Sequence, residues 1–150
     1  MEKSLTVDAV LSAPNTDAHV VILKSEDALF LPIWVGAQEG NAIRFAMEHI
    51  QPPRPLTHDL FRQLLDHLHV RVERVLIASV KGSTYFAEVW LMADGRRLKI
   101  DCRPSDALAL ALRAQAPIYA ADEVMETQRL EQLDTLLEQF RPKDVGHYDA

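Results

Sequence analysis

The spacing of apolar residues changes at Gly36 from the period of a β-strand to the period of a helix. Before Gly36, residues 4–11 alternate and predict a strand with Leu5, Val7, Ala9 and Leu11 on one face. Two more strands are predicted at residues 18–24 and 29–35. After Gly36, residues 37–50 place their apolar side chains on one helical stripe. A chain that changes period in this way must pack helices against a sheet.

The segment after this helix contains three prolines within residues 52–55, which end the helix and form a short rigid connector. Thr57 is the predicted N-cap of a second helix. Five apolar residues recur at helical spacing in that helix, and we expect them to form its buried stripe: Leu60, Phe61, Leu64, Leu65 and Leu68.

The remainder of the chain alternates strands with helices. Strands are predicted at residues 70–80, 84–92 and 96–103, with Asp94-Gly95 as a hairpin turn, and Pro104 opens an almost wholly apolar helix. A short strand at residues 117–120 precedes an amphipathic helix at residues 123–140. The order predicts an α+β fold with a mixed, largely antiparallel sheet, two to three packed helices and a C-terminal amphipathic helix.

Length and composition predict one compact domain with a real core. The chain has 150 residues, of which 48% are apolar and 25% charged. No apolar run is long enough to span a bilayer or to act as a secretory signal, so a cytoplasmic protein without a membrane partner is expected. The single cysteine, Cys102, excludes an internal disulfide and a multi-cysteine metal site.

The formal net charge of −6 argues against tight, nonspecific binding to nucleic-acid phosphates. It does not exclude a site that concentrates carboxylates around a metal ion while a few arginines face a substrate. The sequence contains no Gly-rich phosphate loop, His-Glu-x-x-His pair, nucleophile elbow or zinc-ligand spacing. Any chemistry must therefore come from looser groups of polar residues.

One such group lies where the strand ending near residue 103 passes into the next helix. Arg103 could hold a phosphate there, while Asp101 and Asp106 hold a cation or water and Ser105 lies in the first helical turn. The structural alternative is that Asp106 only complements the helix dipole and that Arg103 pairs with Asp101.

Two other helix starts carry candidate residues. His58 could act as a general acid or base or as a metal ligand, and Asp59 could orient it or bind the same ion, although helix capping explains both residues equally well. Glu39 lies in the first turn of the helix at residues 37–50, which also carries Asn41 and Arg44. An acidic residue is expected at that position for dipole reasons alone.

At these same residues the sequence resembles the bifunctional nuclease domain family. The resemblance rests on four blocks in order: Leu-Pro-Ile-Trp-Val-Gly at 31–36, Glu39 with Ala42 and Ile43, Pro-Pro-Arg-Pro-Leu-Thr-His-Asp-Leu at 52–60, and Asp-Cys-Arg-Pro-Ser-Asp-Ala-Leu-Ala-Leu-Ala at 101–111 with Pro-Ile-Tyr at 117–119. It divides the chain into a nuclease-like domain at residues 1–125 and a C-terminal extension at residues 126–150.

The resemblance implies a mixed α+β fold, cleavage of RNA, DNA or both, and assembly into a homodimer or another homo-oligomer. The implied catalytic residues are Glu39, His58, Asp59, Arg103 and Asp106, and the implied substrate-binding residues are Arg54, Arg103 and Ser105. As a hypothesis, Asp59, Asp106 and Glu39 hold one divalent ion, Mg²⁺ or Mn²⁺, which activates a water molecule. His58 would transfer protons, and Arg103 would stabilise charge on the phosphate.

The rival interpretation is a noncatalytic module that binds a ligand or a protein with the same polar cluster. It agrees better with the acidic net charge and with the few aromatic residues available for stacking on bases. A third interpretation gives the cluster a purely structural role. Only the nuclease needs turnover, and only the nuclease and the binding module need a site open to solvent.

Overall fold

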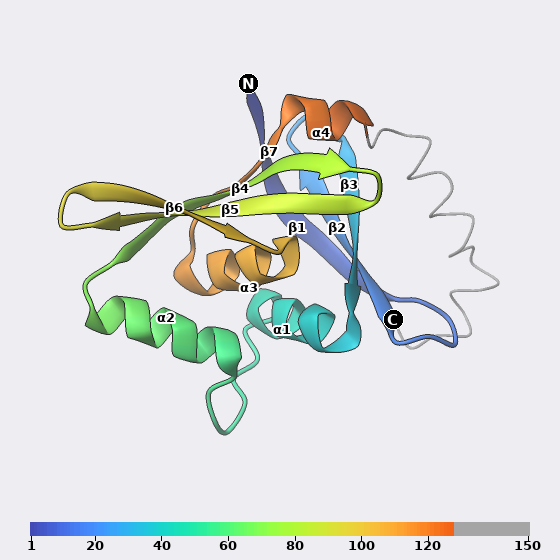
Figure 1. The fold of residues 1–150 in the computed structure, drawn as a ribbon. Helices are drawn as coiled ribbons and strands as arrows, with labels where there is room; N and C mark the ends of the chain where they lie inside the picture. The colour runs from blue at the N-terminus through green and yellow to red at the C-terminus, as the bar shows by residue number, and fades with distance from the viewer. Residues whose placement is uncertain (128–150) are drawn as a thin grey trace.

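The computed structural model describes residues 1–127, which form one strongly curled sheet of seven strands covered by helices (Figure 1). The strand order is β3-β2-β1-β7-β4-β5-β6, and every neighbouring pair is antiparallel except β4 and β7. The strands are β1 (Glu2–Ser12), β2 (Ala18–Ser25), β3 (Phe30–Gly36), β4 (Arg71–Lys81), β5 (Thr84–Ala93), β6 (Arg96–Cys102) and β7 (Ile118–Ala121). The predicted mixed, largely antiparallel sheet is confirmed.

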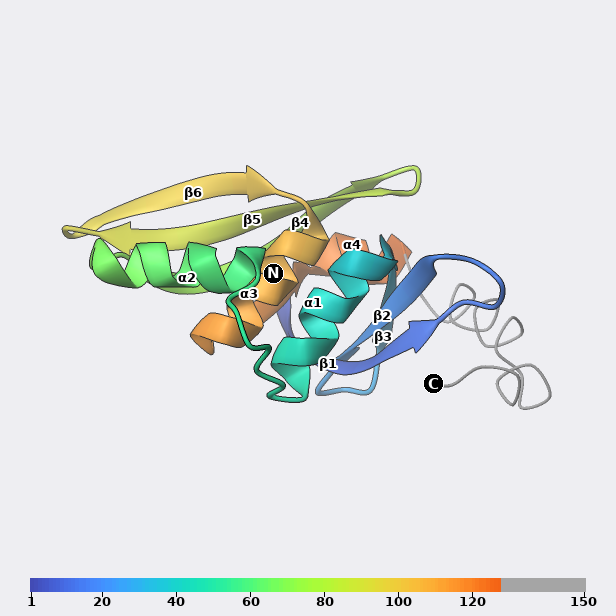
Figure 2. The ribbon, with the colours of Figure 1, turned by 90° about the horizontal axis from the view of Figure 1, so that it is seen from below.

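Three helices, α1 (Ala37–Met47), α2 (Thr57–His67) and α3 (Pro104–Ala114), lie together below the sheet in Figure 1, and Figure 2 shows them from that side. A fourth, α4 (Asp122–Thr127), packs against β4 and β7, away from the other three. The α+β class is therefore confirmed. The helix predicted at residues 123–140 begins one residue earlier, and its part beyond residue 127 lies outside the described residues. None of the helices within residues 1–127 is long and apolar enough to cross a membrane.

The hairpin predicted at Asp94-Gly95 connects β5 to β6. Asp94 and Gly95 both have positive φ values, 51° and 74°. Two consecutive left-handed residues are what a tight two-residue hairpin loop requires, and aspartate followed by glycine is well suited to that conformation. The turn chemistry of the sequence thus sets the register of the β5–β6 pair.

The first strand departs from the regular alternation that its sequence suggests. A β-bulge between Val7 and Ala9 shifts the pairing of β1 with β2. Val7 consequently packs against the main core, whereas Ala9 and Leu11 pack against a separate small cluster around Val20. The expectation that all four alternating apolar residues of this strand share one face is wrong, because the extra residue of a bulge reverses the side on which later side chains lie.

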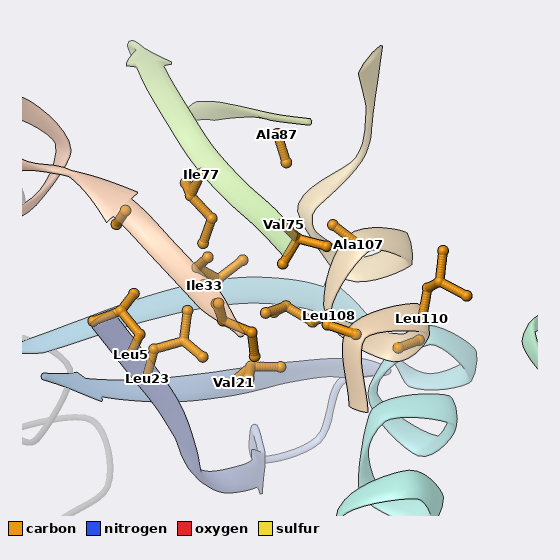
Figure 3. Packing of buried hydrophobic residues seen from close by; sticks show 14 of the residues in the cluster. Leu5, Val21, Leu23, Ile33, Val75, Ile77, Ala87, Ala107, Leu108 and Leu110 are labelled. Atoms are coloured by element: carbon orange, nitrogen blue, oxygen red, sulfur yellow. The ribbon is translucent and has the colours of Figure 1, made fainter. Parts of the chain in front are cut away.

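Helix α3 supplies the centre of the core. Its residues 107–111 are all buried, and Leu108 and Leu110 contribute the largest of these side chains. Figure 3 shows them beside apolar residues of the sheet, among them Val21, Ile33 and Val75. The nearly continuous apolar sequence of this helix is explained by contact with neighbours on most of its circumference.

Helix α2 corrects two expectations. Leu56, not Thr57, is its N-cap, and Thr57 is the first helical residue. Of the five residues predicted to be buried, only Leu65 is, at 7% exposure. The other four expose much of their surface: Leu60 62%, Phe61 44%, Leu64 53% and Leu68 62%. The spacing correctly predicted an apolar stripe, but spacing does not tell whether the rest of the same chain covers it.

Candidate functional site

The polar residues of the strand-to-helix junction form an ion pair at the start of α3. Arg103 is the N-cap residue of α3, Pro104 follows at the first helical position, and Asp106 lies in the first turn. Arg103 donates from Nε to Asp106 Oδ2 at 2.9 Å and from Nη2 to Asp106 Oδ1 at 3.2 Å. This two-point contact fixes the plane of the guanidinium beside the positive end of the helix.

His58 reaches the same carboxylate from the first turn of α2. Its Nε2 lies 2.9 Å from Asp106 Oδ1, because α2 packs against α3. Partial burial alone would raise the pKa of Asp106, but the hydrogen bonds from Arg103 and His58 outweigh that effect and hold its pKa below the usual value. Asp106 is therefore ionised at neutral pH and links an imidazole to a guanidinium.

Glu39, from the first turn of α1, completes the group that we call the Arg103 cluster: Glu39, His58, Arg103 and Asp106. Glu39 Oε2 lies 3.7 Å from Arg103 Nη1, and the Arg103 side chain remains 64% exposed. The ion pair with Asp106 is the main cause that raises the pKa of Arg103, with Glu39 adding to it. In this cluster a solvent-exposed guanidinium lies between two carboxylates, and the histidine lies on the side away from solvent.

A hollow of about 270 Å³ opens beside the Arg103 cluster. It lies between the edge strand β3, the start of β5 and the start of α3. Ser105, which is buried, lines it together with Arg103 and Glu39, as does Tyr85 of β5. The cluster therefore borders a space in which a small group could contact the guanidinium.

Asp59 lies apart from the Arg103 cluster in spite of its position next to His58. Its Oδ2 accepts a hydrogen bond from the Leu56 backbone N–H at 2.8 Å, and its Oδ1 accepts one from Arg113 Nε at 2.6 Å. Burial would raise the pKa of Asp59, but these two donors hold its pKa below the usual value. Neighbouring helical residues point about 100° apart, which explains why the pair faces two different partners.

Arg113 connects all three lower helices. In addition to Asp59 of α2, its Nη1 donates to the carbonyl oxygens of Ala42 in α1 and Ala109 in α3, each at 3.0 Å, and its side chain is only 8% exposed. No role was predicted for Arg113 from the sequence. The available signal was a single arginine near the end of a helix that is otherwise almost entirely apolar, where a charge needs a partner.

The remaining predicted site residues lie outside the cluster. Arg54 is exposed in the connector between α1 and α2 and makes no hydrogen bond or ion pair with any described residue. Arg44 pairs with Glu48 on its own helix at 3.3 Å. Asp101 is exposed on β6, opposite Glu88 in the register of β5 and β6, and Arg103 pairs with Asp106 instead.

The three carboxylates expected to hold a divalent ion are not assembled as one site. Within residues 1–127, no group of three or more histidine, cysteine, aspartate or glutamate side chains is arranged to hold a metal ion. Glu39 and Asp106 both contact Arg103, whereas Asp59 contacts Arg113. The carboxylate of each expected metal ligand thus already contacts an arginine guanidinium.

A larger hollow, about 770 Å³, lies between α1, the connector, α2 and α3. It is lined by Asp59 and Arg113 but by no member of the Arg103 cluster. Asp59 and Arg113 pair with each other there, and Arg113 also donates to two backbone carbonyls, whereas Arg103 and Glu39 of the cluster line the smaller hollow. The smaller hollow is the candidate site.

The cluster lies within the part of the chain that matches a known protein family. The model of the bifunctional nuclease domain matches residues 21–132, a range that includes every member of the Arg103 cluster. An uncharacterised protein of Mycobacterium tuberculosis is 37% identical over 112 residues, which are 75% of this chain and 66% of that protein.

Two similar plant proteins are named as bifunctional nucleases. Bifunctional nuclease 2 of Arabidopsis thaliana is 32% identical over 70% of this chain and 34% of its own length, and bifunctional nuclease 1 of Oryza sativa subsp. indica is 30% identical over 71% and 33%. The chain thus matches about a third of the length of these plant relatives. Because the domain model covers more than half of it, the chain belongs to the bifunctional nuclease domain family.

Proposed function

We propose that the Arg103 cluster hydrolyses phosphodiester bonds in RNA, DNA or both. The observation that carries the proposal is the position of Asp106, which contacts His58 with one oxygen and Arg103 with both. A proton-transfer group and an anion-binding group are thereby held at a fixed separation. Hydrolysis of a phosphodiester requires these two roles in one place.

Arg103 would bind the substrate phosphate. Its guanidinium is held by Asp106 through Nε and Nη2, while Nη1 lies on the side of Glu39 and most of the side chain faces solvent. A guanidinium fixed in this way can donate to a phosphate oxygen and stabilise the negative charge that grows during attack. Its permanent charge makes it independent of pH in this role.

His58 would transfer the protons. With Asp106 ionised, their 2.9 Å contact assigns the ring proton to Nε2 and leaves a lone pair on Nδ1. Nδ1 takes a proton from a water molecule as the water oxygen bonds to phosphorus. The bond from phosphorus to the leaving nucleotide oxygen then breaks, and that oxygen receives the proton from His58, which returns to its starting state.

The expected Mg²⁺ or Mn²⁺ does not fit the observed ligand set. Such ions prefer several oxygen ligands, but Glu39 and Asp106 face a guanidinium and Asp59 is bound to Arg113 and to a backbone N–H. A divalent cation at the cluster would also have to overcome repulsion from Arg103. We therefore assign no step of the proposed reaction to a metal ion.

The test is cleavage of labelled single-stranded RNA and DNA by rigorously purified protein, with Mg²⁺, with Mn²⁺ and with chelator. His58→Ala should lower turnover about a hundredfold or more, because a positioned proton-transfer group contributes at least that much. His67→Ala is the matched control, since His67 is an exposed histidine in the last turn of the same helix. The chelator arm tests the expectation of metal dependence separately.

Three outcomes are informative. Turnover that falls in His58→Ala and persists in His67→Ala supports the nuclease and its site. Equal turnover in all three proteins indicates a contaminating nuclease and contradicts the assignment. No turnover by the wild type under any condition favours the noncatalytic module, in which Arg103 binds an anionic ligand or protein segment through its exposed guanidinium.

A substitution at Gly36 can displace the side chain of Glu39 while Glu39 itself is unchanged. A Cβ at Gly36 would collide with Glu39 Oε1, while the Gly36 backbone has an ordinary extended conformation with φ −76°. Gly36→Ala should therefore displace the Glu39 carboxylate, a mobile side-chain end, with little change in the free energy of unfolding. We expect turnover to fall about tenfold, a modest effect for a misplaced site residue. Unchanged kcat and KM would show that the position of Glu39 does not matter.

We further propose that the protein forms a homodimer through α2. Four large apolar side chains, Leu60, Phe61, Leu64 and Leu68, lie exposed on that helix at the spacing of a packing seam. A two-fold axis beside Leu64 would place the stripe of one copy against the same stripe of a second copy. Such a self-complementary contact closes after two copies and covers the apolar surface of both.

A charge introduced at the centre of the stripe should separate the copies. Leu64→Glu is expected to give a monomer in sedimentation equilibrium at concentrations at which the wild type is a dimer, because burying an unpaired carboxylate between two apolar helices is strongly unfavourable. Gln63→Glu is the control, since it adds the same charge to the same helix beside the stripe. A wild type that sediments as a monomer at all concentrations would contradict the proposal.

A further inference from the structure

The polar lining of the hollow beside the Arg103 cluster consists of three hydroxyl-bearing residues and one pair of opposite charges. The hollow lies where the curled sheet brings β3 beside the turn between β4 and β5 (Figure 1). The hydroxyl-bearing residues are Ser83, Tyr85 and Ser105, and the charged residues are Glu39 and Arg103. Because the two charges balance, a neutral group that carries both hydrogen-bond donors and acceptors matches this lining.

Ser105 carries a buried hydroxyl that has no hydrogen-bond partner among residues 1–127. Two polar residues in that range are buried, Ser25 and Ser105. The Ser25 hydroxyl donates to Asp27 and accepts from the Leu29 backbone N–H. The Ser105 side chain makes no such bond, although it is only 6% exposed, and it lines the hollow. Buried hydroxyls are nearly always paired, which indicates that an occupant of the hollow supplies the missing partner.

Tyr85 brings a second neutral hydroxyl to the same face of the sheet. It alternates along β5 with the buried Ala87 and Val89, and like them it packs in the core that contains α3. Its side chain makes no hydrogen bond with any part of the chain that the structure describes. Burial raises the pKa of Tyr85 to about 12, so the phenol keeps its proton at neutral pH and can both donate and accept a hydrogen bond.

Glu39 supplies an acceptor that lacks donors. Its side chain is 27% exposed, and its carboxylate accepts no hydrogen bond from a residue in the described range. Arg103 Nη1 lies 3.7 Å from Glu39 Oε2, which is too long for a hydrogen bond. A partly buried carboxylate in this condition is stabilised by a ligand that brings an O–H group to it.

We infer that the hollow receives one ribose of an RNA strand, whose 2′-hydroxyl donates to Glu39 and accepts from Ser105 while the adjoining phosphate contacts Arg103. A 2′-hydroxyl is both a donor and an acceptor, and it is the group by which a protein distinguishes RNA from DNA. Carboxylates hold ribose 2′-hydroxyls in the same way in dinucleotide-binding folds. The inference rests on the proposed nuclease function and adds the substrate class, with Glu39 and Ser105 as specificity-determining residues.

A deoxyribose in the same place would leave Glu39 and Ser105 without partners. A site that is built to bond a substrate hydroxyl rejects the analogue that lacks it, because the polar groups of the site then stay unpaired. Glu39 is partly exposed, so water replaces some of the lost contact. We therefore expect RNA to bind about tenfold more tightly than DNA of the same sequence at the same salt concentration. DNA remains a weaker ligand that is held through its phosphate.

The test compares uridine and 2′-deoxyuridine oligonucleotides of about twelve residues, which differ from each other only in their 2′-hydroxyls. Their dissociation constants are measured by fluorescence anisotropy of labelled strands at one salt concentration. His58→Ala serves as the parent protein, because this substitution lowers turnover in the proposed mechanism and His58 does not line the hollow. The parent should bind the uridine strand about tenfold more tightly than the deoxyuridine strand.

Ser105→Ala, added to this parent, should weaken binding of the uridine strand about fivefold, the usual effect of one neutral hydrogen bond, and leave the deoxyuridine strand unaffected. Ser4→Ala is the matched control, since Ser4 is exposed on β1 and does not line the hollow. Affinity for the deoxyuridine strand and circular dichroism both verify that the variants fold. Equal affinity of the parent for the two strands, equal losses for both strands in Ser105→Ala, or no binding by the parent would each overturn the inference.

The two proposals fail in different ways. Loss of cleavage in the His58 variant together with a preference for RNA that is absent or independent of Ser105 would retain the nuclease and reject the ribose pocket. A preference for RNA that depends on Ser105, without cleavage by the wild type under any condition, would retain the pocket and reject the nuclease.

Discussion

Replacing Asp106 by asparagine should lower phosphodiester cleavage about a thousandfold while the protein stays folded. Asparagine keeps the size of the side chain but removes the charge that holds the Nε2 tautomer of His58 and the two-point contact with Arg103. A substitution that leaves geometry intact but changes the histidine tautomer costs about ten-thousandfold in a serine-histidine-aspartate triad, so a loss of about a thousandfold is a moderate expectation here. Initial rates on labelled RNA and DNA measure the effect.

The control for this substitution is Asp122→Asn. Asp122 lies in the first turn of α4 as Asp106 lies in the first turn of α3, so both variants lose a carboxylate near a helix start. We expect Asp122→Asn to cleave at the wild-type rate. The denaturation midpoints of the two variants show whether each stays folded under the assay conditions, and the helix-dipole part of the loss is about 0.3–1 kcal/mol for either carboxylate. Full activity of Asp106→Asn would refute the assigned site.

Arg113→Met should lower the free energy of unfolding by about 3 kcal/mol, because it leaves the partly buried Asp59 carboxylate without its cation. It also removes the donors to the carbonyl oxygens of Ala42 and Ala109. Methionine retains most of the aliphatic volume, so the loss reports on polar contacts and not on a cavity. Urea denaturation followed by circular dichroism gives the free energy and checks that the slope with denaturant is unchanged.

Two comparisons show whether the loss of stability is specific to the contacts of Arg113. Arg44→Met breaks the exposed pair with Glu48 and should change the free energy of unfolding by about 0.5 kcal/mol or less. The difference between wild type and Arg113→Met should also shrink in acid. The lowered pKa of Asp59 means that its ion pair contributes fully above the ordinary value of 3.8 and is lost as the pH falls through the lower, folded-state pKa. A loss below about 1 kcal/mol at neutral pH would contradict the structural role of Arg113.

The fold was largely predictable because its signals are local. The turn at Asp94-Gly95, the helix start at Pro104 and the presence of the predicted strands each depend on neighbours in sequence, and each is confirmed. The bulge in β1 was not predictable, since nothing in the alternation of residues 4–11 shows that the partner strand pairs with one residue skipped. The exposure of Leu60 and Leu64 was missed for a similar reason, because it depends on what packs opposite α2.

The candidate site was predictable only in part. His58 and Asp106 are 48 residues apart in sequence, and the family resemblance, not their spacing, indicated that they belong together. Asp59 was grouped with His58 because the two are adjacent, but adjacency on a helix separates their directions. The hollow beside the cluster was not predicted, because its residues come from β3, β5 and α3, which are far apart in sequence. These segments meet only after the sheet has curled.

The shortest strand of the sheet also constrains how the chain can fold. β7 has four residues, yet it pairs with β1 on one side and β4 on the other, and so joins β3-β2-β1 to β4-β5-β6. During synthesis, β1 to β3 and β4 to β6 would form two separate groups of strands. Their edges would stay unpaired until residues near position 121 leave the ribosome. Pairings between such distant segments form late and slowly, and uncovered edges invite association with other chains. The nascent protein should therefore be most prone to aggregation just before its last described strand emerges.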